Sequence, residues 1–132
     1  MTPTPVFPQS PRTDIATLTG ATALTGRGNI TGTTGLVQLV PTTTDGYRLD
    51  SLLLKFTGNT AAGLVGIWIF DGTTSFLWRE LSFSVVNTAS TTTASSELLA
   101  EYTNVTLKAT EALYISETVS QDLTVFAHGG GF

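Results

Sequence analysis

Apolar residues in this chain gather in short runs separated by glycine, threonine, asparagine and aspartate, and the densest runs lie within residues 47–86. That stretch holds three consecutive apolar runs, two turn signals between them and both tryptophans of the protein. Short runs that are rich in β-branched and aromatic residues and bounded by turn residues are typical of β-strands. The pattern therefore predicts three consecutive strands, and we expect the rest of the fold to be organised around them.

The most apolar of these strands is expected at residues 64–70. Side chains alternate along a strand, so one face carries three β-branched residues and suits a sandwich interior. The other face carries three larger side chains: Leu64, Trp68 and Phe70. A sandwich strand normally has one solvated face, so these three residues require cover by a loop, by the N-terminal segment or by another subunit. In the preceding strand, at 48–57, one face is expected to be core and the other mixed.

Asp71-Gly72 predicts a tight turn, because glycine supplies the positive φ that such turns need. Strict alternation along the return strand, expected at residues 76–86, places Leu77 and Phe83 on one face and Trp78 on the other. Trp78 and Trp68 would then be neighbours on one outward face, as a candidate hot spot for association. The alternative is that both tryptophans pack beneath a loop of the same chain.

The remaining runs predict shorter strands in a regular series. We expect them around residues 15–19, 23–25, 36–40, 97–107, 113–117 and 123–127, with a loop at 26–35 and a polar loop at 87–96. About eight strands with turn signals between them, and no long helix, predict an all-β fold. The fold class is an antiparallel β-sandwich, for which we favour a jelly roll.

Prolines are concentrated at the N-terminus, where they predict an extended arm over residues 1–12, ahead of a single domain at 13–132. Four of the five prolines stand there: Pro3, Pro5, Pro8 and Pro11. Each fixes φ and removes a hydrogen-bond donor, so the arm is no central strand. It is either a solvated terminus or an arm laid over a neighbouring subunit with Val6 and Phe7 as its apolar anchor, which its stiffness favours.

Composition narrows the classes of function. Only 12% of the 132 residues are charged and about one in five is threonine, so some surface is expected to be covered by a partner. The net charge is −4 and the six Lys and Arg are scattered, which argues against binding to nucleic acid. No apolar run approaches the roughly 20 residues of a membrane span, and no secretory signal is expected. The absence of cysteine fits synthesis in a reducing cytoplasm.

Residues with catalytic chemistry form no recognisable motif. His128 is the only histidine and has no cysteine to share a metal site with. Gly26-Arg27-Gly28 lacks the spacing of a phosphate-binding loop. We therefore expect no enzyme, no catalytic residue, no metal and no cofactor, although a carboxylate pair distant in sequence stays open.

A further pattern covers about two thirds of the chain. It consists of a basic residue that starts a strand, a small-residue link, an F-x-D-G turn, an R-E pair and a glycine-rich end. Here these are Arg48, residues 55–63 (KFTGNTAAG), residues 69–72 (IFDG), Arg79-Glu80 and residues 126–132 (FAHGGGF). With these motifs residues 47–132 resemble a widespread group of small bacteriophage and prophage virion proteins.

The resemblance implies a function that the residues alone do not. Small jelly-roll proteins of such virions look like head decoration, or cement, proteins, which sit as trimers on the capsid lattice. It implies a non-enzymatic homotrimer on the capsid surface, made in the host bacterial cytoplasm, whose partner is the major capsid protein. The expected interface residues are Val6, Phe7, Leu64, Trp68, Phe70 and Trp78. The alternative is a tail-fibre or baseplate module for carbohydrate binding and host attachment, with Trp68, Trp78 or Tyr102 stacked on sugar rings.

Overall fold

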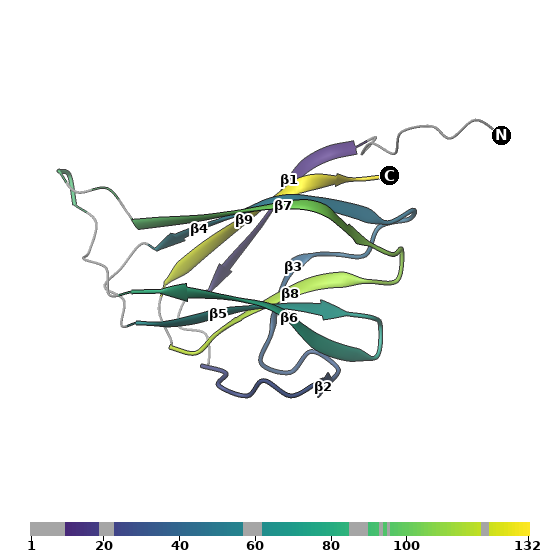
Figure 1. Ribbon diagram of the computed structural model, residues 1–132, viewed down its shortest axis with the longest axis horizontal. Helices are drawn as coiled ribbons and strands as arrows, with labels where there is room; N and C mark the ends of the chain where they lie inside the picture. The colour runs from purple at the N-terminus through teal and green to yellow at the C-terminus, as the bar shows by residue number, and fades with distance from the viewer. Residues whose placement is uncertain are drawn as a thin grey trace.

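Two antiparallel β-sheets pack together as a β-sandwich in the computed structural model (Figure 1), which describes residues 10–18, 23–56, 62–84, 90–92, 94, 96–119 and 122–132. Nine strands are formed within these ranges, and no helix. They are β1 (Ser10–Leu18), β2 (Ile30–Thr31), β3 (Val37–Val40), β4 (Tyr47–Phe56), β5 (Gly63–Phe70), β6 (Thr74–Phe83), β7 (Ser96–Leu107), β8 (Ala112–Glu117) and β9 (Leu123–Gly131). The predicted all-β sandwich is confirmed.

The strands pair in a nested pattern, in which each pair encloses the previous one along the chain. Sheet A is 4-stranded in the order β1-β9-β4-β7, and sheet B is 5-stranded in the order β2-β6-β5-β8-β3. The hairpin β5–β6 is innermost, and β4–β7, β3–β8 and β1–β9 pair around it in turn. Figure 1 shows the two sheets as stacked layers, with sheet A above sheet B. The two ends of the described chain meet at this outermost pair, where Ser10 is opposite Gly131.

The core lies between the two sheets and is built by alternation. In β5, Val65 and Ile67 are fully buried, as predicted for the β-branched face. In β4, Leu52, Leu54 and Phe56 are buried, and alternate residues of β9 meet them from the next strand. Each such side chain contributes on the order of 1.5–3 kcal/mol when fully buried, so the alternating apolar residues account for the two-layer architecture.

The glycines near the C-terminus belong to β9, and at Gly129 the Tyr47 ring fills the space that a side chain would need. Tyr47 of β4 is 1% exposed. A Cβ added at Gly129 would overlap the carbonyl oxygen of Arg48 and would lie 2.6 Å from Tyr47 Oη. Gly129 is therefore a packing feature that lets a tyrosine lie against a neighbouring strand.

The N-terminal part differs from the expectation. β1 begins at Ser10, so residues 10–12 of the predicted arm pair with β9, and residues 1–9 lie outside the described residues. Pro11 is accommodated because β1 is an edge strand and requires fewer ladder donors. Residues 23–25 form no strand, whereas two residues of the predicted loop form β2.

A β-bulge in β6 changes which residues face the core. Ile67 is opposite Arg79, but the next residue, Trp68, is opposite Leu77, so Trp78 is an extra residue in the ladder. Such a bulge shifts the alternation by one position. Trp78 therefore packs against the core cluster, and Leu77 lies beside Trp68 on the outer face. The hypothesis that the two tryptophans share an outward face is wrong for this reason.

Candidate functional site: a contact surface on sheet A

The residues expected at an interface on β5 lie on the outer face of sheet B. Trp68 is 1% exposed, and its Nε1 donates a 2.8 Å hydrogen bond to Ser116 Oγ of the neighbouring strand β8. Gly66 makes room for this pair, since a Cβ there would lie 2.8 Å from Ser116 Oγ and 3.0 Å from Trp68 Nε1. Leu64 and Phe70 are half-buried, and Phe70 meets the ring of Tyr114 edge-on at 5.6 Å.

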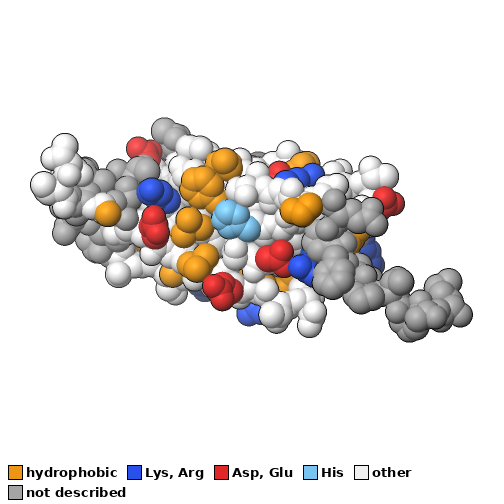
Figure 2. All heavy atoms as spheres, turned by 90° about the horizontal axis from the view of Figure 1, so that it is seen from above, with side chains coloured by type: hydrophobic (Ala, Val, Ile, Leu, Met, Phe, Trp, Pro, Cys, Tyr) orange, Lys and Arg blue, Asp and Glu red, His pale blue; other side chains and the backbone are white. Residues whose placement is uncertain are grey.

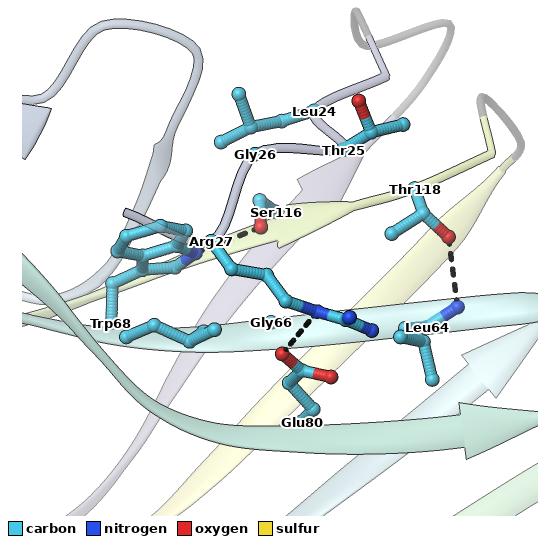
Figure 3. A pocket seen from close by; sticks show the side chains of 11 residues that line it. Leu24, Thr25, Gly26, Arg27, Leu64, Gly66, Trp68, Glu80, Ser116 and Thr118 are labelled. Carbon is cyan, nitrogen blue, oxygen red and sulfur yellow. Dashed lines mark hydrogen bonds and ion pairs between the residues drawn. The ribbon is translucent and has the colours of Figure 1, made fainter. Parts of the chain in front are cut away.

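A loop of the same chain lies over Trp68. We call residues 24–27 the covering loop; Figure 3 shows it above the indole, with the Arg27 side chain reaching Glu80. Arg27 Nε lies 2.8 Å from Glu80 Oε1, and Leu24 N donates a 2.8 Å hydrogen bond to the carbonyl of Glu117. The space left beside the indole is about 10 Å³, room for one water at most. Of the two interpretations of Trp68, the loop of its own chain is the one that the structure shows.

The other expected interface residues lie elsewhere. Val6 and Phe7 are outside the described residues. Trp78 lies where the two sheets meet at one side, with its ring 5.2 Å from that of Tyr102 and the Arg79 guanidinium 5.3 Å from its centroid. Burial raises the pKa of Tyr102, and the charge of Arg79 opposes this rise. Of the four that the structure describes, the three on β5 lie on the outer face of sheet B and Trp78 packs against the core, so these four do not form one surface.

An apolar surface is present instead on the outer face of sheet A. Ile15 of β1 is opposite Phe126 of β9, Phe126 is opposite Leu53 of β4, and Leu53 is opposite Leu99 of β7. These four side chains, which we call the apolar row, cross all four strands of the sheet. Ile15 is 59% and Leu99 56% exposed, while Phe126 and Leu53 are half-buried. Figure 2 shows a band of apolar side chains on this face, with the single histidine beside it.

Two polar rows flank the apolar row, one on each side along the strands. On one side Thr17, Thr124, Lys55 and Glu97 lie in register. On the other side Thr13, His128, Ser51 and Glu101 lie in register. Lys55 Nζ and Glu97 Oε1 are 3.8 Å apart, and His128 Nδ1 lies 3.1 Å from Thr13 Oγ1. An apolar centre within a polar rim is the anatomy of a protein–protein contact surface.

The apolar row was missed because each member is isolated on the outward face of its own strand. Each of the four strands contributes one large apolar residue to this face, and the residues two positions before and after it are polar. No local pattern distinguishes it from the scattered apolar residues of ordinary surfaces. Only the register of four strands brings them together. The mixed second face predicted for residues 48–57 was the one available signal, because Leu53 stands on it.

Perturbed ionisable groups elsewhere have structural causes. Burial raises the pKa of Tyr47 to about 12; Asp14 and Asp50 add to this rise and Arg12 opposes it. In the β5–β6 turn, the N–H groups of Thr74 and Thr73 donate to Asp71 Oδ1 and lower the pKa of that carboxyl. These shifts follow from packing and turn geometry.

Within the described ranges, no group of three or more His, Cys, Asp or Glu is placed to hold a metal ion. The described part of the chain forms no helix long and apolar enough to cross a membrane. In comparisons with known proteins, no family model, no curated protein and no solved structure matches this chain. The surfaces of the sandwich are therefore the features that bear on function.

Proposed function

We propose that this protein is a non-enzymatic structural protein of a bacteriophage virion that decorates the head and stabilises the capsid lattice. The observation that carries the proposal is the apolar row of sheet A, which gives the molecule a contact surface on an otherwise polar face. Ile15 and Leu99 are both more than half exposed on this row. Exposed apolar side chains that lie side by side, rather than singly, mark sites where another protein binds.

The strand arrangement supports the same class of protein. Apart from β2, the strands pair as β1–β9, β3–β8, β4–β7 and β5–β6, and these pairs are divided between two sheets. A hairpin that is folded over in this nested manner gives the two four-stranded sheets of a jelly roll, an architecture shared by viral capsid and lectin domains. We infer a jelly roll on this basis. The fold alone does not assign a role, because unrelated functions share it.

The resemblance to phage virion proteins directs the proposal to the phage head. Its motif residues have structural tasks here: Asp71-Gly72 makes the β5–β6 turn, with Gly72 at φ 101°, and Gly129 packs on Tyr47. The motifs therefore support the fold and the family, and the contact surface supports the role.

Stabilisation of a shell by such a protein follows from linkage. A protein that binds the assembled lattice and not the separate subunits lowers the free energy of the assembled state by RT ln(1 + [L]/Kd), about 2.7 kcal/mol at a concentration of 100 Kd. Binding at many equivalent sites multiplies this gain over the shell. No catalytic step is required of the decorating protein.

The alternative function, carbohydrate binding on a tail fibre or baseplate, requires exposed aromatic rings. Trp68 is covered by its own chain, while Trp78 and Tyr102 pack on each other with ring centroids 5.2 Å apart. None of these three rings presents a free face of the kind that stacks on a sugar, so the geometry favours the decoration role.

Copy number and location test the proposal. Quantitative mass spectrometry of purified particles, with the major capsid protein as internal standard, should find the protein at a copy number comparable to that of the lattice sites. A cryo-EM map of the same particles should place it on the outer surface of the head. A few copies per particle, or density at the tail, would contradict the proposal.

A further inference from the structure

We infer that the apolar row of sheet A is the contact between two copies of this chain, which pack sheet A on sheet A about a two-fold axis parallel to the strands. The inference deepens the proposed function by assigning the row to the assembly of the decorating protein, so that the unit on the lattice is a dimer. It rests on that function in one respect, that the row is a protein contact. It names the occupant of the row, a second copy, and the geometry of the pair. That geometry follows from the register of the sheet and the charges beside the row.

Pairing through the edge of sheet A is disfavoured by charge. The edge strand β7 is free of proline and could pair with β7 of another copy, which would continue the apolar row across both molecules. An antiparallel pair centred on Leu99 places Glu97 of each copy directly opposite Glu101 of the other. Like charges directly opposite on paired strands are destabilising, so face-to-face packing of the two sheets is favoured over pairing of their edges.

Two different two-fold axes would stack the faces so that the apolar row of one copy lies on that of the other. The charges beside the row distinguish between these two axes. An axis along the row exchanges the two polar rows, so Glu97 of each copy again meets Glu101 of the other. An axis parallel to the strands keeps each polar row on its own side and reverses the strand order, so that β7 faces β1. Glu97 then meets Thr17, and Glu101 meets Thr13, of the other copy. Each carboxylate faces a hydroxyl that can donate to it, and no like charges face each other.

The apolar contacts are complementary in the same arrangement. The reversed order β7-β4-β9-β1 lies over β1-β9-β4-β7, so Ile15 meets Leu99 and Phe126 meets Leu53 of the other copy. The two most exposed members of the row therefore cover each other at both edges of the contact. A contact of this kind is isologous and closes with two copies.

The size of the face sets the expected strength. Four strands at a spacing of about 4.8 Å, and strands of nine residues at about 3.3 Å per residue, give a face of about 19 by 30 Å. Two such faces bury about 1,100 Å² in total, near the lower limit for a specific interface. We therefore expect a dimer that forms with micromolar affinity, in place of the homotrimer that the resemblance implies.

Sedimentation of the full chain between about 1 and 300 µM tests this directly, since that range brackets a micromolar dissociation constant. The wild type should shift from monomer to dimer as its concentration rises. Ile15→Lys or Leu99→Lys should each weaken the dimer at least 10-fold, because each places a charge against an apolar side chain. Phe76→Lys is the matched control: Phe76 is 41% exposed but lies on β6 of sheet B, so dimerisation should be unchanged.

The double variant Ile15→Lys/Leu99→Glu tests the axis. With the axis parallel to the strands, both edge contacts become pairs of opposite charge, so the dimer should recover relative to Ile15→Lys alone or Leu99→Glu alone and become sensitive to salt. With the axis along the row, like charges would meet at both edges and the dimer would be lost. As the chain lacks cysteine, a bis-maleimide reagent should join Ile15→Cys chains to Leu99→Cys chains in preference to chains of the same kind.

Each outcome decides one part of the inference. A wild type that stays monomeric throughout the range overturns the second copy as occupant, and a trimer overturns the two-fold axis. A double variant that does not recover, with no cross-linking between the two cysteine variants, overturns the orientation of the axis. Circular dichroism of each variant confirms that it is folded. None of these results alters the copy number on particles, so the proposed function stands or falls separately.

Discussion

The two outer faces of the sandwich present the same physical problem with different solutions. On sheet B, Trp68 points outward and is 1% exposed, because the covering loop lies over it and Ser116 binds its indole nitrogen (Figure 3). On sheet A, Ile15 points outward and is 59% exposed, and apolar side chains lie at the surface of this face (Figure 2). The more apolar strand carries the better covered face. An apolar stretch of sequence shows which strand face must be shielded from water. Whether a loop of the same chain or a partner shields it depends on where the loops run.

The largest effect should come from Trp68→Ala, which removes a large side chain enclosed by its own chain. Aromatic-to-alanine substitutions at such sites cost about 3–5 kcal/mol of unfolding free energy. Denaturation with urea, followed by circular dichroism because a tryptophan is lost, measures it. Phe76→Ala, at an exposed position of the adjacent strand, is the control and should cost much less. A loss below about 1 kcal/mol for Trp68→Ala would mean that the covering loop does not enclose the indole.

A smaller effect is expected for Ser116→Ala, which leaves the Trp68 Nε1–H without its acceptor beside a space with room for one water at most. An unsatisfied buried donor costs about 1–3 kcal/mol. Ser82→Ala, at an exposed serine on the same face, should change stability by no more than about 0.5 kcal/mol. In a double-mutant cycle, the cost of Ser116→Ala should disappear in the background Trp68→Phe, which has no ring N–H. An unchanged cost in that background would show that Ser116 acts through something other than this bond.

Sequence patterns predicted the fold where a strand alternates without interruption. β5 shows this, because Val65 and Ile67 are both enclosed by the core that their alternation requires. β6 shows the limit. One extra residue at Trp78 reverses the faces of the residues N-terminal to it, and Trp78 packs against Tyr102 on the other sheet. No pattern within the sequence of β6 predicts that contact.

The contact surface was less accessible to sequence reasoning than the fold. The apolar row depends on β1 pairing with β9, so Ile15 and Phe126 meet across most of the length of the chain. A residue pattern reports local periodicity, and the row has none. The low charge of the chain predicts that a partner covers some surface, which stays a prediction, and it gives no position for that surface.

A third and smaller effect tests how firmly the covering loop is held. Arg27→Ala removes the ion pair with Glu80, in which the side chains are 64% and 29% exposed. Exposed pairs contribute about 0–1 kcal/mol, because water and salt screen them. The cycle with Glu80→Gln isolates the pair, and its coupling should fall at about 1 M salt, where the screening length is about 3 Å. A coupling well above 1 kcal/mol that salt leaves unchanged would make this pair, rather than the burial of Trp68, the main attachment of the loop.

The smallest effect on the folded monomer is expected on the other face. Leu99→Ser, measured at about 1 µM, should change the unfolding free energy by no more than about 0.5 kcal/mol, because more than half of the side chain is already in water. At about 300 µM the wild type should gain stability from its own association, and the variant should not, so their melting temperatures should separate as concentration rises. Phe76→Ser, which alters an exposed residue outside the row, should show no such separation. The unfolding free energy of Leu99→Ser could instead fall by several kcal/mol at the lowest concentration. Leu99 would then be enclosed by its own chain as Trp68 is, and the two faces would differ only in which segments of the chain cover them.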